Sequence, residues 1–360
     1  MTILWINLAI VFFLAFLARY FAIAVPSQGT IEFIKPNKLL VAGALFSLVI
    51  VSGLREGIGD TGAYRHAYTI NNFTWGYITS QKDIGFGIFQ AILKHFTNNA
   101  QVLIFLTALI TNVLIIIVLY KYSRLFELSL YVYITNGWFL TSMNGMRQCL
   151  AAAIIFAATK FLFDGSWKKY FIVVLLASTI HETAFILLPL YFIVRRKAWT
   201  WTTLVIIMMA IVIVLGFNQF SEVLYSVIKD TQYGGYNNFS EGGANILRVA
   251  VDAAPLLIAF LGRHRLRQIL PNSDCIVNLS IIGIVFMIVS TQDWIFARFS
   301  IYFSLYQLIL ISWIIKLFKS NNQRFIYYLI IFFYFIYHYY ENVITLNIQY
   351  SSSFINLLVN

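Results

Sequence analysis

Charged side chains are scarce in this sequence of 360 residues. Lys, Arg, Asp and Glu together make up 11% of the chain, whereas hydrophobic residues make up 60%. A soluble protein carries about a quarter of its residues as charges, which cover its surface. Lipid must therefore cover the apolar surface that a single soluble core cannot bury. The composition predicts an integral membrane protein and no separate soluble domain.

Motifs for metals, nucleotides and redox chemistry are absent from the sequence. The cysteines Cys149 and Cys275 are isolated in or beside apolar runs, and they form neither a metal-binding pattern nor a disulfide framework. The sequence has no P-loop, no GxGxxG in a strand–helix setting, no DxD-type pair and no HExxH. We therefore expect no metal and no cofactor. Nucleotide-driven transport and nucleotide-sugar chemistry on the cytoplasmic side are not favoured.

Acidic residues are fewer than basic ones, at 14 against 25, and the net charge is +11. No basic stretch alternates with polar and aromatic residues in the way of a nucleic-acid-binding groove, so we expect no nucleic-acid partner. Cytoplasmic loops of membrane proteins concentrate Lys and Arg instead. Six such clusters occur, around Lys35/Lys38, Lys121/Arg124, Lys160/Lys168/Lys169, Arg195/Arg196/Lys197, Arg263/Arg265/Arg267 and Lys316/Lys319/Arg324.

Apolar runs follow one another along the whole chain, and a helix of about 20 such residues crosses a bilayer. We predict spans near 3–24, 38–54, 100–120, 126–143, 147–163, 198–217, 246–262, 275–292, 298–318 and 325–345. The first is read as a retained helix, not a signal peptide, because it is long enough to span. The predicted fold is an all-α polytopic transmembrane helix bundle of about 10–12 membrane segments in one domain, residues 1–360.

The basic clusters predict the orientation of these spans. All six lie on one side if the stretch 170–194 enters and leaves the membrane there, with a break near His181 and Glu182. The alternative is one long span that places Arg195 outside. The hairpin leaves the N-terminus outside, together with loops near 55–99 and 218–245. Within the first loop, 84–96 is too short to cross and fits an interfacial or re-entrant helix.

The predicted outer side carries both signs of charge close to helix ends, where charge is costly and needs a reason. Arg55, Gly57, Gly59 and Asp60 follow the second span, with Tyr64 beyond them. Glycines let a backbone approach a ligand, and arginine offers a planar fork of donors for phosphate oxygens. Asp60 could orient the arginine, accept a sugar hydroxyl or act as a base. The alternative is a turn with an internal Arg–Asp pair.

Three further arginines lie at the predicted outer starts of helices: Arg147, Arg248 and Arg298. A helix N-terminus presents free N–H groups and partial positive charge, so an added arginine makes an anion site. A snorkelling interfacial arginine is the alternative for Arg147. For Arg248, an i, i+4 pair with Asp252 would neutralise both charges. His181 and Glu182 add groups able to move protons, unless the histidine is only a hydrogen-bonded packing residue.

Taken in order, four stretches make the chain resemble the EpsG-type branch of the Wzy polysaccharide polymerases. They are Arg55 to Tyr64, Met146-Arg147-Gln148 followed by Ala151-Ala152-Ala153, Ala177 to Pro189 around His181-Glu182-Thr183, and Arg298 to Phe303. They span roughly residues 50 to 305. Where the family tends to have a small or basic residue after the histidine, this chain has Glu182. The proton carrier thus stays open between His181, Glu182 and neither.

The resemblance implies a metal-independent membrane glycosyltransferase of the bacterial cytoplasmic membrane. Such proteins join undecaprenyl-pyrophosphate-linked oligosaccharide repeat units into O-antigen, capsule or exopolysaccharide at the outer face. A chain-length regulator and a flippase are its expected partners. The expected pyrophosphate ligands are Arg55, Arg147, Arg298 and Arg248, and the rival bases are Asp60 and His181 with its neighbour Glu182. Expected sugar contacts are Tyr64, Gln148, Tyr236 and Asp293.

Two other functions are weighed against polymerisation. An O-antigen ligase uses similar chemistry but hands the glycan to a different acceptor. A non-catalytic flippase or transporter would distribute charges along a path through the bilayer and would show internal repeats. Here the charges gather at one predicted face and no repeat is evident. The sequence therefore favours a polymerase that acts on lipid-linked glycans.

Overall fold

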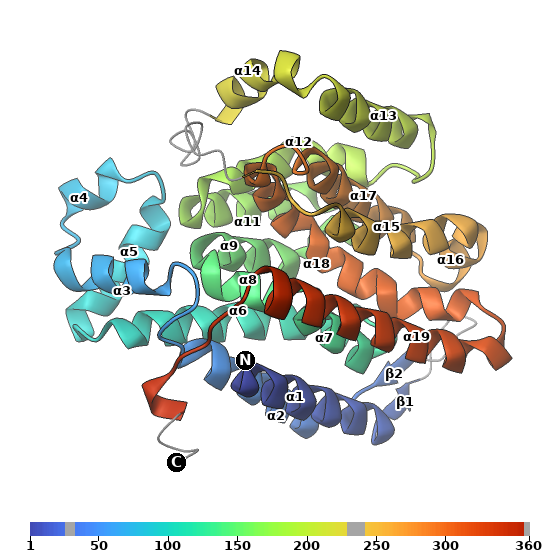
Figure 1. The fold of residues 1–360 in the computed structure, drawn as a ribbon, viewed down its shortest axis with the longest axis horizontal. Helices are drawn as coiled ribbons and strands as arrows, with labels where there is room; N and C mark the ends of the chain where they lie inside the picture. The colour runs from blue at the N-terminus through green and yellow to red at the C-terminus, as the bar shows by residue number, and fades with distance from the viewer. Residues whose placement is uncertain (26–32, 229–241, 356–360) are drawn as a thin grey trace.

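The computed structural model describes residues 1–25, 33–228 and 242–355, and it forms an all-α bundle of membrane helices (Figure 1). This confirms the predicted fold class. The first helices, α1 (Thr2–Tyr20) and α2 (Lys38–Gly53), pack against each other. Between them β1 (Ile23–Val25) and β2 (Phe33–Lys35) pair antiparallel. Asn37 caps α2 by accepting the N–H groups of Leu39 and Leu40.

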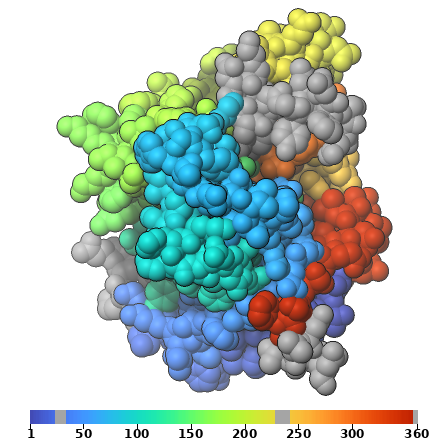
Figure 2. Space-filling view, turned by 90° about the vertical axis from the view of Figure 1, so that its left-hand side faces the viewer, coloured from blue at the N-terminus to red at the C-terminus, as the bar shows by residue number. Residues whose placement is uncertain are grey.

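Three short helices follow α2 and project at one end of the bundle. They are α3 (Thr61–Ile70), α4 (Trp75–Ser80) and α5 (Ile84–Phe96). They lie at the left in Figure 1 and across the middle of the face that Figure 2 shows, in light blue and cyan. The helix α5 occupies the segment predicted to be interfacial or re-entrant, and it packs against α11 and α6.

The next segments build the centre of the bundle. The helix α6 (Ala100–Tyr122) covers the whole of the predicted span 100–120 without a break. The predicted span 126–143, in contrast, is divided into α7 (Phe126–Thr135) and α8 (Trp138–Asn144). The break lies at Gly137, whose φ of 89° is accessible to glycine without a steric penalty. Similarly, 147–163 is divided at Ala158 into α9 (Met146–Ala157) and α10 (Thr159–Phe163).

The stretch around His181 is a hairpin. It consists of α11 (Trp167–Ile180), the 3₁₀ helix η1 (Glu182–Ile186) and α12 (Leu187–Val194). Its two ends meet: a Cβ on Gly165 would lie 2.7 Å from a guanidinium nitrogen of Arg195. The chain therefore enters and leaves at the same end of the bundle, as the basic clusters predict.

The remaining elements cover and complete the bundle. They are α13 (Trp201–Leu215), α14 (Phe217–Ile228), α15 (Ile246–Leu261), α16 (Arg263–Ile269), α17 (Ser273–Val289), η3 (Trp294–Phe296), α18 (Ala297–Ile314), η4 (Ile315–Leu317), α19 (Ser320–His338) and the π-helix η5 (Tyr339–Thr345). The axes of α13 and α14 differ by 110°, and these two helices lie at the top of Figure 1.

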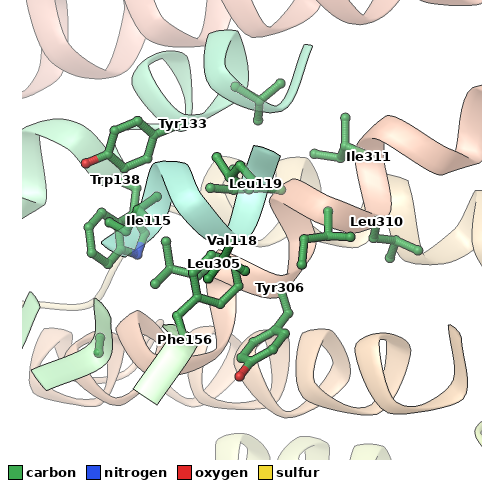
Figure 3. Close-up of a cluster of buried hydrophobic side chains, with 14 of the residues drawn as sticks. Ile115, Val118, Leu119, Tyr133, Trp138, Phe156, Leu305, Tyr306, Leu310 and Ile311 are labelled. Carbon is green, nitrogen blue, oxygen red and sulfur yellow. The ribbon is translucent and has the colours of Figure 1, made fainter. Parts of the chain in front are cut away.

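The core is centred on α18, which packs against α7, α9, α15 and α17. Figure 3 shows Leu305 and Tyr306 of α18 among apolar side chains from α6, α7, α8 and α9. Leu305 and Tyr306 are fully buried. Moving such a side chain from water into a protein core contributes about 1.5–3 kcal/mol. Where lipid surrounds the helices, close packing between them provides the stabilisation instead. The core therefore places the start of α18, with Arg298, firmly relative to its neighbours.

Within the part of the chain that the structure describes, three helices are each long and apolar enough to cross a membrane: Thr2–Tyr20, Ala100–Tyr122 and the continuous run Trp294–Leu317. The bent pair α13 and α14 passes the same test together. Several shorter apolar helices, including α2, α9 and α17, accompany them. The predicted number of membrane segments stays a prediction, because many of the predicted spans are divided between two helices.

Arginines at one end of the bundle have polar partners from neighbouring segments. At the end that carries β1, β2 and α16 in Figure 1, Arg267 pairs with Asp274 and Arg19 pairs with Glu127. Arg265 donates to the Leu317 carbonyl there. The loops of the opposite end carry Arg55, Asp83 and the other mixed-sign residues. The gathering of all six basic clusters on one side of a membrane stays a prediction.

This topology makes a labelling result predictable. In Lys168→Cys and Arg196→Cys, which alter exposed side chains on the two arms of the hairpin, a membrane-impermeant maleimide should react from the same side. Gln81→Cys, an exposed position beside α5, should react only from the other side. Background labelling should be low, because Cys149 and Cys275 are both buried. Labelling of positions 168 and 196 from opposite sides would contradict the hairpin.

Candidate active site

The described residues form a cavity of about 640 Å³. Segments far apart in the chain line it: the loop at 57–59, the α7–α8 region, the starts of α15 and α18, and the C-terminal residues up to 349. Two of the four predicted pyrophosphate ligands, Arg248 and Arg298, are among its lining residues. The structure thus brings together two guanidinium groups that are 50 residues apart in sequence (298 − 248).

Arg298 enters the cavity from the start of α18. The helical run begins one turn earlier, at Trp294, where Asp293 caps it by accepting the Ile295 N–H. The Arg298 guanidinium lies 5.1 Å from the centroid of the Trp294 ring, within the range of a cation–π contact. The Gln148 amide donates to the Arg298 carbonyl at 2.7 Å and ties α9 to α18. Arg298 is half-buried, which leaves part of its side chain to the cavity.

Arg248, in the first turn of α15, forms an ion pair across the cavity wall. Its Nε donates to Oε1 of Glu341 at 2.6 Å, and a second guanidinium nitrogen contacts the same oxygen. Glu341 belongs to the π-helix η5 and is 3% exposed. The ion pair of Arg248 is thus with a distant residue, not with Asp252 one turn further along α15. Asp252 lines the same cavity.

Arg55 lies beneath the cavity wall and is 1% exposed. Its Nε donates to the Thr61 hydroxyl at 3.0 Å and to the Met143 carbonyl at 3.1 Å, and another nitrogen donates to the Ser52 carbonyl. Burial lowers the pKa of Arg55 to about 10, so the side chain stays charged at neutral pH. The residues that follow it, Gly57 to Gly59, line the cavity. Its contacts indicate that Arg55 holds this loop, and its role as a direct phosphate ligand stays a prediction.

The glycine loop after Arg55 is closely packed. Gly59 has a φ of 49°, and a Cβ there would lie 2.2 Å from the Asn144 side-chain oxygen, which accepts the Asp60 N–H at 2.9 Å. On its other side the loop contacts the C-terminal segment: Glu56 N–H donates to the Ser351 carbonyl, and the Glu56 carboxylate accepts the N–H and hydroxyl of Ser353. These hydrogen bonds hold the pKa of Glu56 below its usual range. A side chain at position 59 would collide with Asn144, so this approach requires glycine.

Arg147 lies in a second cluster, which adjoins the cavity. Its guanidinium forms an ion pair with Asp83 at 2.7 Å and donates to the Tyr64 hydroxyl at 3.3 Å. Asp83 also accepts the Glu182 N–H at 3.1 Å, so it connects the start of α5, the start of α9 and the hairpin break. Burial raises the pKa of the Asp83 carboxyl, and Arg147 and the Glu182 N–H offset part of the rise.

His181 lies at the hairpin break and is 3% exposed. Its Nδ1 is 2.8 Å from the Thr183 hydroxyl and 3.0 Å from the Tyr302 hydroxyl. Tyr302 belongs to α18, so His181 connects the hairpin to the helix that carries Arg298. Neither His181 nor Glu182 lines the cavity. Their assignment as proton carriers is untested by these contacts and stays a prediction.

The remaining predicted residues are distributed around the two clusters. Asp60 is exposed at the N-cap of α3. Asp293 caps η3 and accepts the Tyr225 hydroxyl, and Gln148 bonds the Arg298 backbone. Tyr236 lies outside the described residues. Among residues 1–25, 33–228 and 242–355, no three His, Cys, Asp or Glu side chains are placed to hold a metal ion.

Asp83 predicts how stability depends on pH. The pKa of Asp83 is higher in the folded chain than in the unfolded one. The contribution of this group to the stability of the fold is therefore full below the ordinary carboxyl pKa, and it is lost as the pH rises through the folded-state pKa. Asp83→Asn removes this titration. The Tm of the variant minus the Tm of the unmodified protein should therefore rise as the pH increases above about 4. The matched control is Asp164→Asn, an exposed carboxylate at the other end, and a Tm difference that falls with pH would contradict the prediction.

Sequence reasoning missed three contributors to these clusters. Glu341 stands in a run of aromatic residues, Asp83 precedes a short helix, and residues 346–349 follow the last predicted span. An isolated carboxylate in an apolar stretch is the signal that could have singled out Glu341. The position of the C-terminal segment against Leu54 and Glu56, where Ser352 and Ser353 bond them, has no local signal.

Comparisons with known proteins identify the family of the chain. No curated protein and no solved structure matches it. A protein-family profile does match: that of the EpsG family, over residues 38–355. The match includes every element that lines the cavity, from the glycine loop to the C-terminal segment. The chain belongs to the EpsG family.

Proposed function

We propose that this protein is a polymerase that joins undecaprenyl-pyrophosphate-linked oligosaccharide repeat units into a surface polysaccharide. The growing glycan on the lipid pyrophosphate is the donor, and the sugar end of a new lipid-linked unit is the acceptor. The anomeric C–O bond to phosphate breaks, a new glycosidic bond forms, and lipid pyrophosphate leaves. The observation that carries the proposal is that Arg248 and Arg298 line one cavity in a chain of the EpsG family.

The chemistry of the donor explains why arginines are needed. Negative charge grows on the leaving phosphate oxygen in the transition state, and fixed cationic donors stabilise it more than they stabilise the bound substrate. Arginine suits this task because its planar fork matches phosphate oxygens and stays charged. We assign the main pyrophosphate contact to Arg298. Arg147, which adjoins the cavity in its own ion pair, is proposed to contact the donor only if that pair opens.

The charge distribution supports extracytoplasmic action in a bacterial cytoplasmic membrane. Basic residues anchor the cytoplasmic ends of membrane helices, and the six basic clusters of the sequence are predicted to lie together on the side away from the cavity. The cavity would therefore open outside, where a flipped lipid-linked unit arrives. A flippase would supply that unit and a chain-length regulator would limit the product. An apolar surface around the cavity would accommodate the lipid.

The test is product formation by the purified protein. Cells that lack this chain should accumulate single lipid-linked units and lose long polymer, and their membranes then supply the substrate. In proteoliposomes, the protein should convert the extracted unit into a ladder of longer lipid-linked glycans. Transfer that stops after one step onto a different acceptor would indicate a ligase instead. Absence of any transfer, with unchanged glycans in the deletion strain, would reject the proposal.

A further inference from the structure

The proposed reaction needs a group that accepts the proton of the acceptor hydroxyl. Neither of the two bases expected from the sequence, Asp60 and His181, lines the cavity. Two carboxylates do, Asp252 of α15 and Glu341 of η5. General bases act within hydrogen-bond distance of the proton that they remove, so the site's own carboxylates are the groups to consider.

Glu341 is distinguished from Asp252 by its hydrogen bonding. Its side chain is 4% exposed and its Oε1 contacts Arg248. Its second oxygen, Oε2, is buried and has no hydrogen-bond partner among the described residues. A buried carboxylate oxygen without a partner costs about 1–3 kcal/mol, so such an atom calls for a ligand or a function.

The backbone explains how Glu341 reaches this position. The segment Tyr339–Thr345 is a π-helix, in which the Leu346 N–H bonds the Glu341 carbonyl at 2.9 Å. Such widened turns insert an extra residue and occur often at functional sites. Asn342 is buried beside His338, whose Nδ1 lies 2.9 Å from its amide nitrogen. These contacts hold the turn that carries Glu341.

We propose that Glu341 is the general base of the transfer reaction and that Arg248 positions it, a proposal that rests on the proposed function. The Glu341 carboxylate takes the proton of the acceptor sugar hydroxyl as the hydroxyl oxygen forms a bond to the anomeric carbon. The bond from that carbon to the phosphate oxygen breaks, and its electron pair leaves with the lipid pyrophosphate. Arg248 orients the carboxylate through its contact with Oε1, while Arg298 faces the leaving group. The cavity thus has an acceptor side and a donor side.

The experiment separates binding of the donor from transfer. The binding probe is undecaprenyl pyrophosphate, which carries the charged group of the donor without any sugar. Glu341→Gln should bind this probe with unchanged affinity, within about threefold, while its turnover with the extracted lipid-linked unit falls by about 10²–10⁴-fold in kcat. Glu341→Asp should recover part of that activity. A purely structural role would lower probe binding and turnover together.

A matched control tests for structural loss. Glu127→Gln removes a buried carboxylate that pairs with the partly exposed Arg19 at the opposite end of the bundle. It should cost stability to a similar extent while turnover per folded molecule is retained. Equal loss of kcat in both variants would overturn the assignment. A Glu341→Gln variant with a nearly normal kcat would also overturn it. An inactive Asp252→Asn variant, found together with an active Glu341→Gln variant, would do the same.

Failure of this inference differs from failure of the proposed function. If the unmodified protein binds the probe but transfers nothing, the polymerase function is rejected before Glu341 is at issue. If the unmodified protein elongates glycans and Glu341→Gln does so equally well, only the assignment of Glu341 is rejected.

Discussion

Arg298→Ala should reduce turnover with the lipid-linked unit by about 10²–10³-fold, which corresponds to about 2.7–4 kcal/mol of transition-state stabilisation. The guanidinium lines the cavity from the start of α18. The charge on the departing pyrophosphate is larger in the transition state than in the bound donor, so most of the loss should appear in kcat. Binding of undecaprenyl pyrophosphate should weaken as well, because the product carries the same charge.

The folded state should tolerate this change. Arg298 is half-buried, and its ring contact with Trp294 at 5.1 Å contributes about 0.5–1 kcal/mol. The control is Arg263→Ala, which removes a comparable contact with Phe260, at 4.7 Å, from the opposite end of the bundle. That variant should keep full activity. Arg298→Ala with unchanged kcat and probe affinity would show that this guanidinium does not contact the donor.

Arg298→Lys adds a finer comparison. Lysine keeps the charge but loses the planar fork that bonds two phosphate oxygens together. We expect activity between those of the unmodified protein and Arg298→Ala. The comparison therefore measures how much of the effect depends on geometry and how much on charge alone.

The arrangement of the helices was largely predictable because two local signals determine it. Apolar runs of spanning length indicate the membrane helices, and the basic clusters at 195–197 and 263–267 predict which of their ends are cytoplasmic. Together they predicted the hairpin at His181, whose ends meet at Gly165 and Arg195. Breaks inside spans were harder to predict. Gly137 divides 126–143 through its left-handed conformation, yet a single glycine within an apolar run is compatible with a continuous helix.

The partners of the charged residues were not predictable, because they depend on packing between distant segments. The i, i+4 rule favoured Asp252 as the partner of Arg248, but the ion pair forms with Glu341, 93 residues away. Likewise Arg147 pairs with Asp83, 64 residues away. Residue type and helix position indicated which arginines face the outer end. Whether each one meets solvent, a carboxylate or a carbonyl follows only from the three-dimensional arrangement.

Arg55 was predicted to bind pyrophosphate, but its contacts are within the protein. We therefore expect Arg55→Met to lower the stability of the fold without a direct effect on the transfer reaction. The substitution introduces an apolar side chain of similar length and removes the hydrogen bonds to Thr61, Met143, Ser52 and the Met146 sulfur. Two carbonyls and a hydroxyl then lose a buried donor. Because unsatisfied buried acceptors are costly, we expect the free energy of unfolding to fall by about 2–4 kcal/mol. The glycine loop at 57–59, which lines the cavity, should lose its fixed position.

Thermal unfolding in detergent and binding of undecaprenyl pyrophosphate, measured on both variants, distinguish the two roles. Arg55→Met should melt at a clearly lower temperature, whereas the fraction that remains folded should bind the probe better than Arg298→Ala does. Arg298→Ala should show the reverse: a nearly normal melting temperature with weakened binding. A stable Arg55→Met variant that no longer binds the probe would place this guanidinium on the pyrophosphate. The loop would then have to open for Arg55 to reach the substrate, because only 1% of the residue is exposed in the closed arrangement.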